Sequence, residues 1–247
     1  MSNSALISCT ILSPNCAKPR THAIDRITPH CVVGQCTAEA LGNLFANPSR
    51  SASSNYGIGY DGRIGMYVEE KDRSWCSSST ANDDRAVTIE CASDTYAPWA
   101  FKPAVYETLI TLCADICRRN GKTKLLWLGD KDKTLAYTPK AGEMVLTVHR
   151  WFANKACPGD WLMERMGELA DRVTRELSPQ PEPWYAEAMA WAEKLGLIKD
   201  GRPNDNLTRA EMATILMRYD KIIDAKILEA LNLLQPEDDS FGGIISD

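Results

Sequence analysis

Strand-like and helix-like patterns of apolar residues alternate along the first 177 residues of the chain. The clearest strand covers residues 86–92, in which every second residue is apolar. Because the side chains of a strand alternate between its two faces, Val87, Ile89 and Cys91 share one face and Glu90 lies on the other. Further strands are expected at residues 23–33, 124–128 and 144–148.

A hairpin and three helices complete this part of the pattern. The Asp61-Gly62 pair stands between two strand-like segments and predicts a β-hairpin within residues 55–68. Apolar residues recur at helical spacing in three segments, and Thr37 can cap the first of them. These segments are residues 37–45, 103–120 and 161–177. Strands that alternate with helices predict an α/β fold with a mixed central β-sheet flanked by helices.

The last part of the chain has a different pattern. Three prolines within residues 178–183 predict a stiff linker. Beyond it, one helix is expected from residue 184 to about 196, and Thr208 with Glu211 forms a capping box for another. Residues 222–234 are amphipathic as well and lead into an acidic end. The expected organisation is a first domain at residues 1–177, a linker at 178–183 and a small all-α module at 184–247.

Composition limits the classes of function. The chain has 247 residues, of which 44% are hydrophobic and 25% charged, as in ordinary globular proteins. The net charge of −5 gives no reason to expect nucleic-acid binding. No apolar stretch approaches the roughly 18 residues that span a membrane, and residues 1–20 lack the pattern of a secretory signal. We therefore expect synthesis in the cytoplasm, where most of the nine cysteines stay reduced.

The three histidines and nine cysteines make the search for a metal site short. His30 and His149 each stand at the end of an expected strand, and Cys157 lies in a turn set by a proline and a glycine. Two neutral imidazoles and one thiolate suit Zn²⁺ and leave its fourth position open, as in catalytic sites. The alternative from periodicity alone is that the histidines are hydrogen-bonded and the cysteine is simply buried.

Glu90 is the best candidate for an acid–base group. A carboxylate within an apolar strand is costly unless it is paired or functional. A general base is needed for hydrolysis by a metal site, and Glu90 has the chemistry for it. The alternative is an ion pair with Arg85 or another cation at the sheet surface.

Four motifs make residues 22–160 resemble a known family. They are ITPH at residues 27–30, NYGIGYDGRI at 55–64, VTIEC at 87–91, and VHRWF at 148–152 followed by KACPG at 155–159. In this order they are similar to the zinc amidases shared by phage endolysins, bacterial cell-wall recycling amidases and peptidoglycan recognition proteins. The resemblance implies an N-acetylmuramoyl-L-alanine amidase with a peptidoglycan amidase-like fold in residues 1–177. Such an enzyme cuts the amide bond between muramic acid and L-alanine in bacterial peptidoglycan.

The resemblance also implies roles for individual residues. His30, His149 and Cys157 match the zinc ligands of the family, and Glu90 matches the general base. Lys155 matches a lysine that stabilises the tetrahedral oxyanion, although an exposed lysine has an ordinary alternative role. Three aromatic residues are further candidates for contacts with sugar or peptide, with packing as the alternative. These are Tyr56, Trp75 and Trp151.

The sequence departs from the family pattern at three places. Pro29 precedes His30 and Cys31 follows it, where the family often has two apolar residues before the histidine. Cys31 and Cys36 could compete for the metal, and core packing is the favoured reading of both. The catalytic tyrosine of phage relatives aligns with Ser54, so that role is not transferred to this chain.

The module at residues 184–247 resembles a single S-layer-homology repeat over residues 184–219. The resemblance implies binding to cell-wall polymers, with a structural role or homodimerisation through residues 222–234 as the alternative. The expected setting is a phage endolysin that stays in the host cytoplasm until the membrane is permeabilised. A bacterial autolysin or recycling amidase, and a non-catalytic peptidoglycan-binding protein, are the alternatives.

Overall fold

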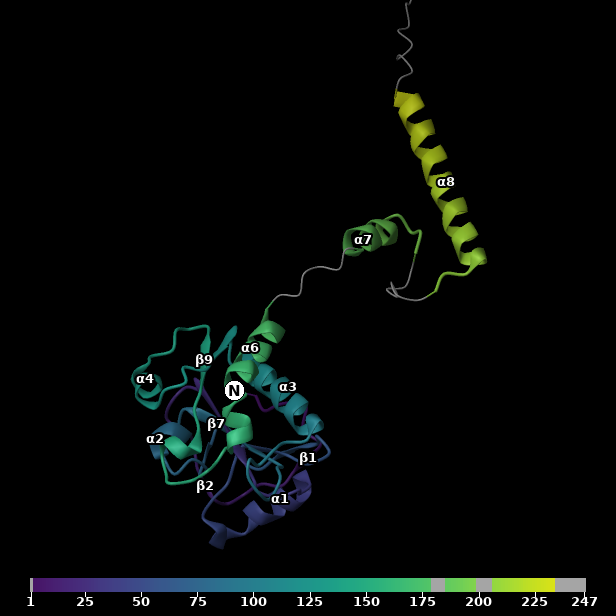
Figure 1. Cartoon of the computed structure of the whole chain (residues 1–247). Helices are drawn as coiled ribbons and strands as arrows, with labels where there is room; N and C mark the ends of the chain where they lie inside the picture. Colours follow the sequence, from purple (N-terminus) through teal and green to yellow (C-terminus); the bar gives the residue numbers. More distant parts are fainter. Residues whose placement is uncertain (1, 179–184, 199–205, 234–247) are drawn as a thin grey trace, which may run out of the picture. The chain divides into compact units, whose positions relative to one another are not determined.

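The computed structural model describes residues 2–178, 185–198 and 206–233 (Figure 1). The chain divides into two compact units, Met1–Gln180 and Pro181–Asp247. The expected linker therefore lies, apart from Ser178, outside the described residues. The two units are described separately below.

A seven-stranded sheet forms the centre of the first unit, in the order β1-β5-β4-β7-β3-β9-β8. Only β4 and β5 pair antiparallel, and every other neighbouring pair is parallel, so the expected mixed sheet is confirmed. The strands are β1 Cys9–Thr10, β3 Arg26–Cys31, β4 Tyr56–Ile58, β5 Ile64–Met66, β7 Ala86–Cys91, β8 Lys124–Leu126 and β9 Glu143–Leu146. Two further strands, β2 Cys16–Ala17 and β6 Arg73–Ser74, form a separate antiparallel pair.

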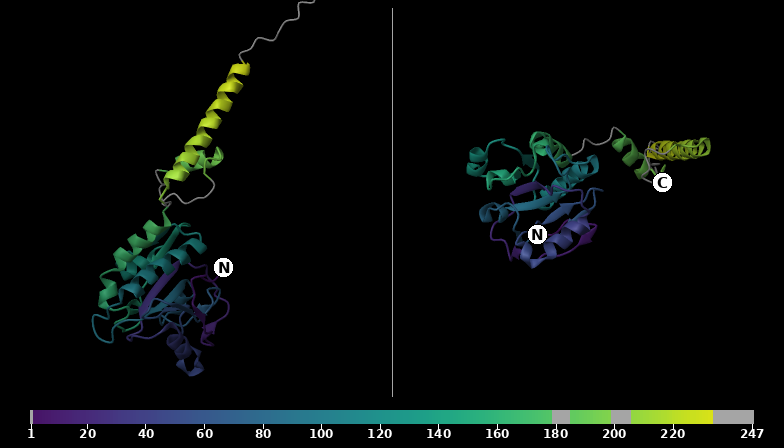
Figure 2. Two further views of the ribbon diagram at one scale, coloured as in Figure 1. Left: turned by 90° about the vertical axis from the view of Figure 1, so that its right-hand side faces the viewer. Right: turned by 60° about the horizontal axis from the view of Figure 1, so that its bottom comes forward.

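Helices cover both faces of the sheet (Figure 2). On one face, α3 and α6 pack against each other over a large apolar core that contains Val87, Ile89 and Cys91. On the other face, α1 packs through a smaller apolar cluster. Glu90 lies on the face opposite the large core, as the period-two pattern predicts. The helices of this unit are α1 Ala38–Ala46, α2 Thr80–Asp83, α3 Pro103–Arg119, α4 Lys131–Ala136, α5 Asp160–Met163 and α6 Met166–Leu177, with 3₁₀ turns η1 Pro48–Arg50 and η2 His149–Trp151.

Two local signals of the sequence are confirmed. The Thr37 side chain accepts a hydrogen bond from Ala40 N at 3.1 Å and so caps α1. Gly62 has a φ of +83° in the turn that joins β4 to β5, a conformation that a side chain would strain. The cysteines are free thiols at all nine positions, all of which are described.

Three segments differ from the expectation. The helix expected at residues 161–177 is broken, because α5 ends at Met163 and α6 begins at Met166. Residues 69–85, for which the pattern predicts no helix or strand, contain β6 and α2. β9 ends at Leu146 and His149 begins η2, so its ring projects from a tight turn rather than from the end of the strand.

The second unit contains two described helices, α7 Ala186–Lys194 and α8 Arg209–Leu233. The expected capping box is confirmed: Thr208 N donates to Glu211 Oε2 at 2.8 Å, and Glu211 N donates to Thr208 Oγ1 at 3.2 Å. The helical segment expected from residue 222 continues α8 and is not a separate helix. The Asp200-Gly201 pair, which predicts a turn, and the acidic end lie outside the described residues. None of the described helices is both long and apolar enough to cross a membrane.

Candidate metal centre and active site

The site is built at one end of three neighbouring parallel strands. His30 on β3 is paired in register with Glu90 on β7. On the other side of β3, Arg26 is paired with Val145 and Ile27 with Leu146. The same register, continued past the end of β9, carries His149 to the level of His30. Side chains that share a level and a face of a sheet lie close together.

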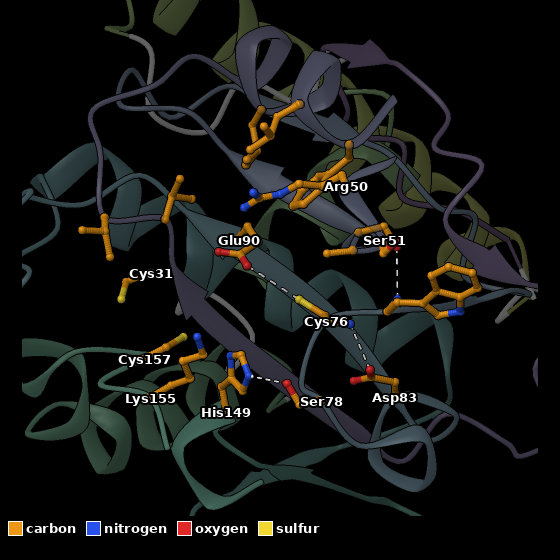
Figure 3. Close-up of a pocket in the computed structure, with 18 of the residues that line it drawn as sticks. Cys31, Arg50, Ser51, Cys76, Ser78, Asp83, Glu90, His149, Lys155 and Cys157 are labelled. Carbon is orange, nitrogen blue, oxygen red and sulfur yellow. Dashed lines mark hydrogen bonds between the residues drawn. The ribbon is translucent and has the colours of Figure 1, made fainter. Parts of the chain in front are cut away.

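Three side chains converge at this end of the strands. Cys157 Sγ lies 3.3 Å from His30 Nδ1, and the rings of His30 and His149 have centroids 5.0 Å apart. One ligand atom from each of the three residues lies within 4.8 Å of the others. Figure 3 shows Cys157 and His149 on the same side of the pocket, below Glu90. The structure thus brings together the three residues that the sequence proposed as metal ligands.

A short turn holds Cys157 in place. Arg150 N donates to Cys157 O at 3.1 Å, and Gly159 N donates to Ala156 O at 2.9 Å. Gly159 has a φ of +89°, and a Cβ there would lie 2.9 Å from Trp99 Cβ. Glycine is therefore required on both counts, for the backbone angle and for the close approach. This turn, held by the N–H of Arg150 in η2, fixes the thiol next to the histidines.

The donor set fits a zinc ion. Burial lowers the pKa of His30 well below its usual value, and the nearby His149 acts in the same direction. Burial also lowers the pKa of His149, together with the charge of Lys155. Both imidazoles are therefore neutral at neutral pH and available as ligands. Two neutral nitrogens and one sulfur within reach of a single ion match a catalytic zinc site with one open position.

Glu90 lies beside this group. Its Oε1 is 3.9 Å from His30 Nδ1 and 3.7 Å from Cys76 Sγ. Its Oε2 is buried and has no hydrogen-bond partner among the described residues. Burial raises the pKa of Glu90 to about 7. A carboxylate with such a pKa can both take and return a proton at neutral pH.

The alternative of an ion pair with Arg85 does not apply to Glu90. The Arg85 guanidinium pairs instead with Asp25, with Nε donating to Oδ1 at 2.8 Å. Within the described residues, Glu90 makes no ion pair with a lysine or arginine. Its burial is therefore not explained by a structural salt bridge.

A pocket of about 880 Å³ opens over these groups. It is lined by Glu90, His149 and Cys157, and also by Lys155 and Trp75. Lys155 is exposed beside Cys157 (Figure 3), and the Trp75 side chain is 38% exposed. The volume lies within the range typical of small-molecule and substrate sites.

Comparison with known families decides the class of protein. The family described as N-acetylmuramoyl-L-alanine amidase matches residues 20–160, which is more than half of the chain. The chain belongs to this family. The S-layer homology domain matches residues 180–213. This amidase therefore carries a C-terminal S-layer homology domain, and its class of reaction is hydrolysis of peptidoglycan.

Several solved structures are similar to this amidase. The catalytic domain of XlyA has 13% identity and a TM-score of 0.48, over 68% of this chain and 99% of that one. A selenomethionine derivative of AmpD has 20% identity and a TM-score of 0.47, over 71% and 96%. The amidase LysCS from Clostridium intestinale has 13% identity and a TM-score of 0.40, over 64% and 91%. Comparison with curated protein sequences gives no match.

Two of the three aromatic candidates lie outside the main pocket. Tyr56 is paired in register with Ile89, so it faces the large core and is fully buried. Its hydroxyl donates to Glu70 Oε1 at 2.7 Å and accepts from Ser4 N. The expectation of a substrate contact for Tyr56 is therefore wrong, because the side chain is on the opposite face from Glu90.

Trp151 is half-buried and stacks on Trp127, with ring centroids 5.1 Å apart. It lines a second, smaller pocket of about 590 Å³ rather than the one over Glu90. Of the three aromatic candidates, only Trp75 lines the main pocket. The expected contact of Trp151 with substrate stays a prediction, and it belongs to a neighbouring surface.

Sequence reasoning missed a loop that borders the site. Ser78 Oγ lies 3.0 Å from His149 Nε2, and Cys76 Sγ contacts Glu90. Asp83 holds this loop by accepting hydrogen bonds from the backbone N–H groups of Cys76 and Ser77. Cys76 and Ser78 stand in a serine-rich segment without periodicity. The only residue there that suggested a site was the cysteine next to Trp75. Arg50, which also lines the pocket, follows α1 in a polar loop and carried no signal.

The two cysteines considered as competing ligands have different surroundings. The Cys31 side chain is only 7% exposed and belongs to the large core. A hydrogen bond with the Cys31 thiol, together with burial, raises the pKa of the Cys157 thiol. Cys36 is half-buried and packs against both apolar clusters. Neither residue is in a group of potential metal ligands among the described residues, which agrees with a packing role.

Proposed function

We propose that this chain hydrolyses the amide bond between N-acetylmuramic acid and L-alanine in bacterial peptidoglycan, with one zinc ion held by His30, His149 and Cys157. The observation that carries the proposal is the convergence of these three donors within 4.8 Å beside Glu90, whose Oε2 is buried. Family membership supplies the class of bond. The complete ligand set disfavours a non-catalytic peptidoglycan-binding protein.

When bound, zinc acidifies water and polarises the carbonyl of the scissile amide, which accounts for its role as cofactor. Glu90 takes up the proton of the attacking water at the buried Oε2, which has no partner among the described residues. The same carboxylate then returns the proton to the leaving nitrogen of alanine. Amine expulsion requires this proton, because an unprotonated amide nitrogen is a poor leaving group.

Lys155 stabilises the negative charge that develops on the oxygen of the scissile carbonyl. It is exposed on the turn that carries Cys157 and lines the same pocket as Glu90. Its ammonium group can therefore approach the oxygen of the scissile carbonyl as negative charge accumulates there. Trp75 offers an apolar ring at the pocket wall for a sugar or peptide of the substrate.

The biological setting is part of the proposal. We propose a phage endolysin that accumulates in the host cytoplasm and reaches the wall after the membrane is permeabilised, causing lysis. The motifs of residues 27–159 are shared with recycling amidases, so an autolysin or recycling amidase with the same chemistry is the alternative setting. The S-layer homology domain at residues 180–213 would bind cell-wall polymer. Dimerisation through α8 is the alternative role of that region.

Digestion of purified cell walls tests the reaction. The full-length protein loaded with zinc is expected to release new amino groups with N-terminal L-alanine and no new reducing sugar ends. Removal of zinc by a chelator is expected to abolish release, and one equivalent of added zinc to restore it. New reducing ends without free alanine termini would contradict the amidase assignment. Full activity after complete removal of zinc would contradict the metal mechanism alone.

A further inference from the structure

A second group of metal-binding side chains lies beside the first. His30, Cys76 and Glu90 each offer one ligand atom, and these atoms lie within 4.8 Å of one another. The group shares only His30 with the three residues assigned to zinc above. It is thus a different ligand set: nitrogen, sulfur and carboxylate oxygen.

The spacing of these atoms fits a single tetrahedral ion. Zinc bonds of about 2.3 Å to sulfur and about 2.0–2.2 Å to nitrogen or oxygen place tetrahedral ligand atoms roughly 3.3–3.6 Å apart. Here Cys76 Sγ is 3.7 Å and His30 Nδ1 is 3.9 Å from Glu90 Oε1. These two spacings lie within a few tenths of an ångström of that range, and the third, between Cys76 and His30, lies within 4.8 Å. In addition, Glu90 Oε2 is buried without a hydrogen-bond partner among the described residues, as expected for a carboxylate that awaits a ligand.

The loop that carries Cys76 is already fixed. Asp83 Oδ2 accepts from Cys76 N at 2.9 Å and from Ser77 N at 3.1 Å. Asp83 itself is buried at the end of α2. The backbone of Cys76 is therefore held against β7, and the thiol reaches Glu90 without movement of the loop (Figure 3).

We propose that His30, Cys76 and Glu90 form a second metal site, selective for thiophilic divalent cations such as Cd²⁺ and Zn²⁺. On binding, the Cys76 thiol loses its proton to solvent and a metal–sulfur bond forms. His30 Nδ1 lies 3.3 Å from Cys157 Sγ and 3.9 Å from Glu90 Oε1, so both sites would use this nitrogen. One nitrogen lone pair binds one ion, so the two sites exclude each other. An ion in the second site takes Glu90 as a ligand and holds it away from proton transfer. This binding does not depend on the amidase reaction.

Cadmium alone is the probe, because a thiolate–cadmium bond gives an ultraviolet charge-transfer band. The metal-free full-length protein is titrated with up to one equivalent of Cd²⁺. Cys157→Ser removes the sulfur of the first site, and the band is expected to persist through Cys76. The double variant Cys76→Ser/Cys157→Ser is expected to lose it. The matched control, Cys31→Ser/Cys157→Ser, removes a neighbouring thiol outside the group and is expected to keep the band.

The remaining outcomes contradict the proposal. Loss of the band in Cys157→Ser alone would mean that Cys76 binds no cation. Persistence in the Cys76→Ser double variant, or loss in the Cys31→Ser control, would assign the sulfur to another cysteine. Thermal unfolding of each metal-free variant verifies that it is folded. In the Cys157→Ser background, the substitution Glu90→Gln is expected to weaken cadmium binding about tenfold or more. An unchanged affinity there would remove Glu90 from the site. None of these readouts uses wall digestion, so a failure here leaves the amidase proposal intact.

Discussion

At the scale of single residues, Glu90 is the side chain on which the proposed chemistry of the pocket most depends. Its neighbours on the same strand, Ile89 and Cys91, face the apolar core, while Glu90 faces the site. Burial raises its pKa to about 7, so the charged form is costly without a substrate or ion to stabilise it. The same strand thus supplies both part of the core and the reactive carboxylate.

The first prediction follows from this position. Glu90→Gln keeps the shape of the side chain but removes its ability to accept a proton. We expect kcat for wall digestion to fall about 10²–10⁴-fold, with KM changed little, because proton transfer is lost and binding is not. Initial rates over a range of wall-fragment concentrations give both constants, and zinc content is measured on the same samples.

The control for this variant is Glu164→Gln, which alters a carboxylate whose side chain is 76% exposed. It is expected to retain the kinetics of the unmodified protein. Wild-type kcat in Glu90→Gln with a full complement of zinc would rule out Glu90 as the base.

Residue-scale reasoning from the sequence succeeded where a pattern fixed the direction of a side chain. The period of two placed Glu90 on the polar face, and the register of β3 and β7 brings His30 beside it. The predicted substrate contact of Tyr56 was wrong, because its side chain takes the other face of the sheet. Its place in a family motif suggested a substrate contact, but its register with Ile89 turns it toward the core. Cys76 and Ser78 could not be predicted, because a loop without periodicity gives no direction.

At the scale of elements, strands with clear alternation and helices with strong caps were predictable. The hairpin at Asp61-Gly62 and the helix capped by Thr37 both formed as expected. Very short strands were not predictable: β1 and β2 have two residues each and depend on partners far along the chain. Their placement comes from tertiary pairing, which local propensity does not contain.

A buried polar network connects α3, β4 and the loop after β5. Arg119 on α3 pairs with Glu70 at 2.6 Å and with Asp115 at 2.9 Å. Glu70 also accepts from the Tyr56 hydroxyl on β4. The Glu70 side chain is 1% exposed, so its charge depends on these partners. The network ties a helix, a strand and the loop after β5 together.

The second prediction concerns this network. Arg119→Ala leaves the Glu70 carboxylate buried without its cation, and we expect a loss of about 3 kcal/mol in the free energy of unfolding. Arg63→Ala is the matched control, because Arg63 pairs with Glu39 where the two side chains are 50% and 36% exposed. That control is expected to cost about 0–1 kcal/mol. Denaturant unfolding of both variants at neutral pH measures the difference. Equal losses in the two variants would show that the buried network is not the stronger contact.

At the scale of the whole molecule, the catalytic groups and the apolar core belong to one unit. Every buried residue of the large core lies between Ile24 and Val173, and every proposed ligand or catalytic residue lies between His30 and Cys157. The S-layer homology match begins at residue 180, where the second unit begins as well. The residues proposed for cutting and the domain proposed for attachment to the wall therefore lie in different units.

This division into two units gives the last prediction. A chain ended after Ser178 keeps the complete core, so its thermal midpoint is expected to match that of the first transition in the full-length protein. On small soluble wall fragments its kcat/KM is expected to equal that of the full chain, because binding to a polymer contributes nothing there. On intact walls at low enzyme concentration, its rate is expected to fall several-fold, since attachment raises the effective concentration of the catalytic unit. Sedimentation of each protein with walls measures attachment directly. If the shortened chain digests intact walls and co-sediments with them as well as the full chain does, the S-layer homology domain is not the wall anchor. Dimerisation through α8 then becomes the role to test, by sedimentation equilibrium.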